Sequence, residues 1–200
     1  AGFRAIGVGY PERINLAFDS EEMALRLLWK GAFAKVNNGS FRVAGTDTIT
    51  FPKGIPFHRL KSLDANWPYK GKTNYMFPHD HGYQFRGYRL DEKRRPTFRY
   101  HYGDVKVEDF FEAVEVEKGK AIFRRTFSFE TPDAQEMFYF RAASGQKIMS
   151  QSEGVYTADT LTVRIPKGQK AIVRKGETGD LLIPLELPQG KSTFTLEYQW

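Results

Sequence analysis

One stretch of the chain decides the fold, and it reads Ala121-Ile122-Phe123-Arg124-Arg125-Thr126-Phe127-Ser128-Phe129-Glu130. Counted in steps of two from Phe123, the positions hold Phe, Arg, Phe and Phe. That period is typical of a strand with one buried face. Thr131-Pro132-Asp133 follows, and residues of these types end a strand in a turn. The stretch therefore predicts a half-buried strand that is followed by a turn.

Similar short segments follow along the rest of the chain. Residues 135–142 are rich in aromatics, and residues 156–165 and 192–200 alternate apolar with polar side chains. Turn residues separate the segments about every ten positions, a spacing typical of antiparallel sandwiches and barrels. We therefore expect an all-β antiparallel β-sandwich, supersandwich-like, in which residues 1–200 form a single domain. The expected core positions are Phe123, Phe127, Phe129, Phe138, Phe140, Leu161, Val163, Ile172 and Leu196.

The amino-terminal half is less regular and rich in loops. Residues 19–28 allow either a helix that begins near Asp19 or a turn followed by a strand. The second interpretation is favoured, because Gly31 ends the run at a marginal length for a helix and Trp29 suits a sheet. Residues 37–84 carry many Gly, Pro and Asn residues. They predict long loops between short strands, where binding sites usually lie.

Composition excludes several classes of function. The 200 residues contain no cysteine, which excludes disulfides, thiolate metal sites, a cysteine nucleophile and haem attached through Cys-X-X-Cys-His within this chain. No run of about 18 apolar residues occurs, so we expect no membrane span. The net charge is +6, but acidic and basic residues are interspersed along the chain, so the net charge alone does not identify a class of binding partner. Nucleotide-binding fingerprints are missing, and no cofactor is expected.

Several phrases in the first half are similar to a known module. They are Gly9-Tyr10-Pro11, Asn15-Leu16-Ala17-Phe18-Asp19, Leu27-Leu28-Trp29-Lys30-Gly31-Ala32-Phe33, Phe85-Arg86-Gly87-Tyr88-Arg89-Leu90 and Pro96-Thr97-Phe98-Arg99-Tyr100. Over residues 4–110 the chain resembles the β-rich module of large exported bacterial proteins, where it accompanies c-type cytochrome and sugar-dehydrogenase-like domains. The resemblance implies a periplasmic or secreted β-sandwich, compatible with the galactose mutarotase-like supersandwich. It also implies neighbouring domains of a larger polypeptide as partners, but no catalytic residues.

Residues 66–88 combine the two kinds of group that bind sugars. A pyranose is recognised by flat aromatic faces and by planar polar groups that reach its hydroxyls. The candidate carbohydrate-binding residues are Asn66, Trp67, Tyr69, Tyr75, His79, Asp80, Tyr83, Arg86 and Tyr88. The alternative is that Trp67 and several of the tyrosines pack the core beneath a long loop.

The histidines suggest two further hypotheses. If residues 75–83 are extended, His79 and His81 point to the same face and form part of a metal site. The favoured alternative is that they hydrogen-bond to backbone carbonyls beside buried aromatics. A sugar-active enzyme would need a positioned acid and base, for which His81 or His101 with Glu108 or Asp109 are the candidates. The plainer interpretation of Glu108 and Asp109 is a solvated turn.

The basic residues between positions 86 and 99 raise the question of whether the protein binds nucleic acids. Its arginines and lysine are interleaved with Tyr88, Phe98 and Tyr100, as in sheets that bind single strands. Asp91 and Glu92 interrupt the run, so residues 90–96 are better interpreted as a charged hairpin tip, and no nucleic-acid partner is expected.

The sequence favours a non-catalytic carbohydrate-binding or accessory module of an exported multidomain bacterial protein. A mutarotase- or glycosidase-like enzyme and a structural docking domain are the alternatives.

Overall fold

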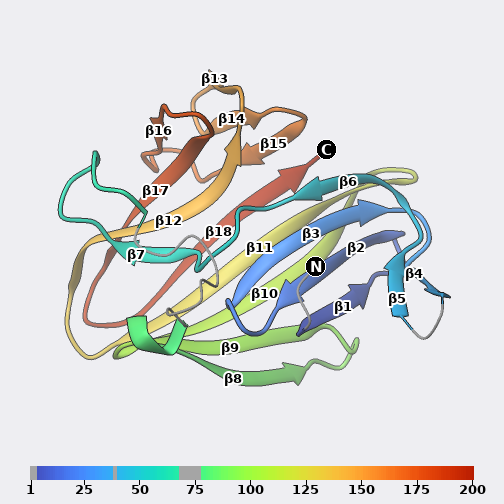
Figure 1. The fold of residues 1–200 in the computed structure, drawn as a ribbon, viewed down its shortest axis with the longest axis horizontal. Coiled ribbons are helices and arrows are strands. Elements are labelled where there is room, and N and C mark those ends of the chain that lie inside the picture. Colours follow the sequence, from blue (N-terminus) through green and yellow to red (C-terminus); the bar gives the residue numbers. More distant parts are fainter. Residues whose placement is uncertain (1–3, 38–39, 68–77) are drawn as a thin grey trace.

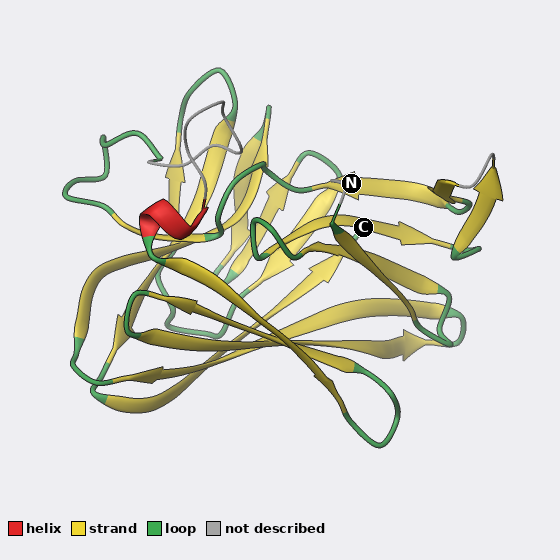
Figure 2. Cartoon of the chain, turned by 60° about the horizontal axis from the view of Figure 1, so that its bottom comes forward, coloured by secondary structure: helices red, strands yellow, loops and turns green. Residues whose placement is uncertain are grey.

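The computed structural model describes residues 4–37, 40–67 and 78–200 of the chain. Most of this part is built from antiparallel strands, which confirms the expected all-β, sandwich-like fold (Figure 2). The short 3-10 helix η1 (Pro78–His81) lies at the start of β8 and is the one helix among the described residues. None of the described helical structure has the length and apolar character needed to cross a bilayer.

The largest sheet has eight strands and extends across the molecule (Figure 1). In spatial order, its strands are β13 (Ile148–Ser152), β14 (Val155–Ala158), β15 (Leu161–Arg164), β18 (Gly190–Gln199), β11 (Lys120–Thr131), β10 (Val105–Glu117), β9 (Pro96–Tyr102) and β8 (Tyr83–Leu90). The strand predicted from residues 121–130 is β11, at the centre of this sheet. The fold is therefore organised around the segment with the clearest alternation.

Two smaller sheets cover one face of the large sheet, and a hairpin stands at the side (Figure 1). One sheet has the order β1 (Ala5–Gly9), β2 (Ile14–Asp19), β3 (Ala24–Lys30) and β6 (Thr46–Thr50). The other has the order β16 (Ile172–Arg174), β17 (Gly179–Leu187), β12 (Gln135–Gly145) and β7 (Phe57–Arg59). The hairpin pairs β4 (Ala34–Asn37) with β5 (Ser40–Val43).

The core lies between these layers and is dominated by aromatic rings. Phe57, on β7, contacts the rings of four phenylalanines from β11 and β12. The predicted core positions are buried, except that Ile172 is only partly buried. Ile172 lies on the short edge strand β16, where it packs against a small separate cluster formed by Leu60, Trp67 and Leu182.

Three local predictions can be compared with the structure. The turn-then-strand interpretation of residues 19–30 is confirmed, because the Asp19 carboxylate accepts hydrogen bonds from two backbone N–H groups of the turn before β3. The charged tip between β8 and β9 is also confirmed, with Asp91 accepting hydrogen bonds from Arg95. The predicted turn at Glu108 and Asp109 is wrong. Both residues lie within the long strand β10, whose alternation continues through them.

Candidate functional site

The outer face of the large sheet carries two rows of polar side chains. Strand registers align His101, Lys106, Glu130 and Lys191 across β9, β10, β11 and β18. The neighbouring row aligns Arg99, Glu108, Ser128 and Thr193 across the same strands. Side chains alternate between the faces of a strand, so these rows are the polar complement of the buried aromatic rows.

A β-bulge in β8 extends this polar face to the edge of the sheet. The register changes between Phe85 and Tyr88, where three steps along β8 oppose two steps along β9. Gly87 lies in the bulge with φ +89°, a conformation that glycine adopts readily. Because of the extra residue, Arg86 and Arg89 both lie on the outer face, whereas Tyr88 faces the same side as Phe98.

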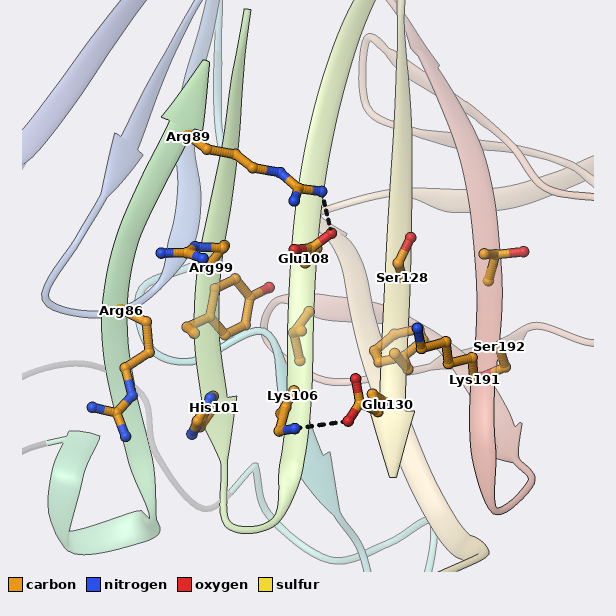
Figure 3. Close-up of a pocket in the computed structure, with 14 residues that line it drawn as sticks. Arg86, Arg89, Arg99, His101, Lys106, Glu108, Ser128, Glu130, Lys191 and Ser192 are labelled. Carbon is orange, nitrogen blue, oxygen red and sulfur yellow. Dashed lines mark hydrogen bonds and ion pairs between the residues drawn. The ribbon is translucent and has the colours of Figure 1, made fainter. Parts of the chain in front are cut away.

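The two rows and the β8 arginines line an open groove of about 760 Å³ (Figure 3). Arg89 donates a hydrogen bond of 2.8 Å to Glu108, and Lys106 donates one of 2.7 Å to Glu130. Within the described part of the chain, the remaining three cations of the groove form no ion pair with a carboxylate. They are Arg86, Arg99 and Lys191. The groove therefore presents unpaired positive charge at both of its ends.

The protonation states in the groove follow from these charges. Partial burial, together with the positive charges of Arg86 and Lys106, lowers the pKa of His101, so its imidazole is neutral at pH 7. The hydrogen bond and the charge of Lys106 lower the pKa of Glu130, and the charge of Lys191 adds to this effect. At neutral pH, His101 is therefore available as an uncharged hydrogen-bonding group. The carboxylates of Glu108 and Glu130 accept hydrogen bonds from Arg89 and Lys106.

The groove brings together three predicted site residues that lie apart in sequence. Arg86, His101 and Glu108 all line it, from three adjacent strands. His101 is opposite Lys106 in the register, whereas Glu108 is opposite Arg99 and accepts its hydrogen bond from Arg89. The structure shows no hydrogen bond between His101 and Glu108, and His81 lies elsewhere, on η1. The predicted acid and base are thus on one face but are not paired.

Most of the other predicted carbohydrate-binding residues lie outside this groove. Trp67 and Tyr83 are 2% and 1% exposed, so their rings have no open face for a sugar. Both residues match the alternative interpretation, in which these aromatics pack the core. The Trp67 indole donates to the Ile55 carbonyl, and the Tyr83 hydroxyl donates to the Phe57 carbonyl. Residues placed elsewhere are Asn66, which lines a second hollow; Tyr88, half-exposed at the sheet edge; and His79 and Asp80, exposed on η1. Tyr69 and Tyr75 lie outside the described residues.

The metal hypothesis for His79 and His81 depends on an extended segment. His79 and His81 belong to the helical turn η1, so the premise of an extended segment with both side chains on one face is wrong. The described residues contain no group of three or more His, Asp or Glu side chains placed to hold a metal ion. The imidazole of His81 instead lies 5.9 Å from that of His58, measured between ring centroids. Burial, and then the nearby charges of His81 and Arg59, lower the pKa of His58 to about 4.

A buried ion pair is the main polar feature that the sequence interpretation missed. Asp109 and Arg125 are 0% and 2% exposed and form two hydrogen bonds of 2.9 and 2.7 Å. Burial alone would lower the pKa of Arg125, but the charge and hydrogen bonds of Asp109 raise it above the usual arginine value, so the guanidinium stays charged. The sequence does contain a signal for this pair. Asp109 and Arg125 each lie between apolar residues two positions away on either side, and this pattern places both side chains on the inward face of their strands.

No protein-family model matches the sequence, and no curated protein matches it significantly.

Proposed function

We propose that this protein is a non-catalytic module that binds an acidic polysaccharide along the groove on the outer face of the large sheet. The observation that carries the proposal is the placement of unpaired cations at opposite ends of the groove, with Arg86 and Arg99 on one side and Lys191 on the other. A setting in the periplasm or outside the cell, beside other domains of a larger polypeptide, follows from the resemblance of residues 4–110 to modules of exported proteins.

The span between these cations favours an extended ligand. Neighbouring strands lie about 4.8 Å apart, so the four steps from β8 to β18 cover roughly 19 Å. Even with Lys191 extended over β11 (Figure 3), three strand steps, roughly 14 Å, separate it from β8, which carries Arg86, so one carboxylate does not bridge these two cations. A polymer with an anionic group on successive units can contact Arg99 and Lys191 at the same time. In Figure 3, Lys191 reaches from β18 over β11, toward the middle of the groove.

The chemistry of the groove matches uronate or sulfate groups. A guanidinium offers a planar pair of donors that fits a carboxylate with two parallel hydrogen bonds. The ion pairs Arg89–Glu108 and Lys106–Glu130 are exposed, and exposed pairs contribute only about 0–1 kcal/mol, so a ligand can displace them. Ser128 and Thr193 lie in the same row as Glu108, and their hydroxyls can form hydrogen bonds with the hydroxyls of a sugar.

The side chains of the groove disfavour the other ligand classes. Neutral sugars and single-stranded nucleic acids are held largely by stacking on exposed aromatic rings. Tyr100 and Phe129 line the groove, but their rings are buried on the inner face of the sheet. A hydrolytic or mutarotase reaction needs a carboxylate positioned together with the histidine, whereas His101 and Glu108 lie in different rows and form no hydrogen bond with each other.

The ligand class is tested by removing charge from the polymer. We expect polygalacturonate, alginate or hyaluronate to bind, and the neutral esterified form of the same polymer to bind at least about tenfold more weakly, because one lost charge-assisted contact is worth about 1.5 kcal/mol or more. Affinity for the acidic form should fall as salt rises from about 0.05 to about 0.5 M, where exposed charges are screened. Isothermal titration calorimetry measures both effects.

Three outcomes contradict the proposal. Binding to none of the three acidic polymers would remove it, as would equal binding to acidic and esterified forms. A single-stranded oligonucleotide serves as the comparison ligand. If it binds more tightly than every polysaccharide, the groove is a nucleic-acid interface instead.

A further inference from the structure

A second hollow, of about 910 Å³, lies on a different sheet from the groove. It is bordered by β12, β16 and β17 and by the loop that carries Asn66 and Trp67. Trp67 fixes this loop, because its indole packs with Leu60 and Leu182 and donates a 3.0 Å hydrogen bond to the Ile55 carbonyl. The side of the hollow beside Trp67 is therefore formed by packed residues.

Its wall contains a sheltered group of charged side chains. Asp180 accepts a hydrogen bond of 2.6 Å from Arg174 and one of 2.7 Å from Ser144, and lies 4.0 Å from the Arg141 guanidinium. The side chains of Arg141, Asp180 and Arg174 are only 7%, 15% and 17% exposed. Arg141 also donates to the Lys53 carbonyl and stacks over the Trp67 ring at 4.9 Å. Both guanidiniums thus converge on one carboxylate.

The sheltered charges do not balance. Two guanidiniums face one carboxylate, which leaves one positive charge in excess among side chains that are mostly buried. The exposed rim adds two lysines, Lys53 and Lys175, and two acids, Asp64 and Glu177, which cancel.

The charges behind the wall do not remove the excess. Arg26 and Glu22 lie near Arg141 and cancel each other. Burial lowers the pKa of Arg141 to about 10, although the charge of Asp180 opposes this shift. An additional anion in the hollow would stabilise the charged guanidinium.

We propose that this hollow binds a small oxyanion, the carboxylate or phosphate group of a polar small molecule, between the guanidiniums of Arg141 and Arg174. One bound negative charge balances the group, and a planar or tetrahedral oxyanion can accept from both arginines. Asn66 and Thr178 line the same hollow and offer polar contacts to the rest of the molecule. This site is separate from the polysaccharide groove and does not depend on it.

Thermal unfolding with two probes, sodium glucuronate and inorganic phosphate, tests the site at ionic strength matched with sodium chloride. A ligand at ten times its Kd should raise the Tm of a protein of this size by about 3–6 °C. At equal concentrations of the two probes, the one that gives the larger shift is the preferred oxyanion, carboxylate or phosphate. The groove variant Arg99→Glu should keep the full shift, which separates this site from the proposed polysaccharide site.

Three variants decide the role of the charged group. Arg174→Gln and Arg141→Gln should abolish the shift, whereas Arg124→Gln, on the large sheet outside both sites, should retain it. Asp180→Asn should tighten anion binding about tenfold or more, because it removes the competing internal carboxylate, an effect that a purely structural role would not produce. The proposal is overturned if neither probe shifts the wild-type Tm, if the shift persists in Arg174→Gln, or if Asp180→Asn weakens binding.

Discussion

Asp109→Asn should destabilise the folded protein by about 3–5 kcal/mol, measured by urea unfolding. The substitution keeps the shape of the side chain but leaves the Arg125 guanidinium buried without its counter-charge. The Arg125 side chain is only 2% exposed, and the rings of Phe111, Phe127 and Phe140 lie 4.4 to 5.4 Å from its guanidinium. These rings attract a cation. Their attraction compensates for only part of the energy lost with an ion pair that also has two hydrogen bonds.

The matched controls distinguish an unpaired charge from general damage. Glu108→Gln, one position along β10 on the exposed face, should change stability by less than about 0.5 kcal/mol. The double variant Asp109→Leu with Arg125→Met should regain much of the loss, because an apolar pair of similar volume leaves no charge to desolvate. A loss below about 1 kcal/mol in Asp109→Asn, or a double variant less stable than either single one, contradicts this account.

Tyr83→Ala should destabilise the protein by about 3–5 kcal/mol, because it leaves a cavity beside η1 and removes a buried hydrogen bond. The Tyr83 ring lies 4.5 Å from the Tyr102 ring, and its hydroxyl donates to the Phe57 carbonyl. Tyr88 provides the matched control on the same strand, since it is 50% exposed, and Tyr88→Ala should cost less than about 1 kcal/mol.

The same two variants test whether Tyr83 contacts a ligand. Both should bind acidic polysaccharide as the wild type does, at a temperature where each is folded. A Tyr83→Ala protein that unfolds like the wild type but loses binding would restore the sugar-platform hypothesis for this residue.

Periodicity was sufficient to predict the strands with one buried face. The alternation around Phe123, Phe127 and Phe129 predicted the central strand β11, and its burial pattern follows the expected face. The interpretation was less reliable where a polar residue occupies an inward position. Asp109 was assigned to a solvated turn because an acidic pair usually lies at the surface, but β10 continues through it, with Arg125 on the adjacent strand as its partner.

The groove was not predictable from local sequence. Its cations come from residues 86–106 and from Lys191, and only the registers of five strands bring them together. Arg86 and Arg89 share a face only because of a bulge, and no period of two predicts one. The aromatic residues of the predicted loop site were a weaker guide, since Trp67 and Tyr83 serve the core.

The most direct test of the central claim is the affinity of a groove variant, Arg99→Glu with Lys191→Glu, for the best acidic polysaccharide. Losing two charge-assisted contacts of about 1.5 kcal/mol each should weaken binding about 100-fold. The control variant, Lys118→Glu with Lys167→Glu, makes the same change in net charge at exposed positions outside the groove and should bind within about threefold of the wild type, because salt screens distant charges. Equal losses in the two variants would show that the polymer responds to net charge alone, and would contradict a binding site in the groove.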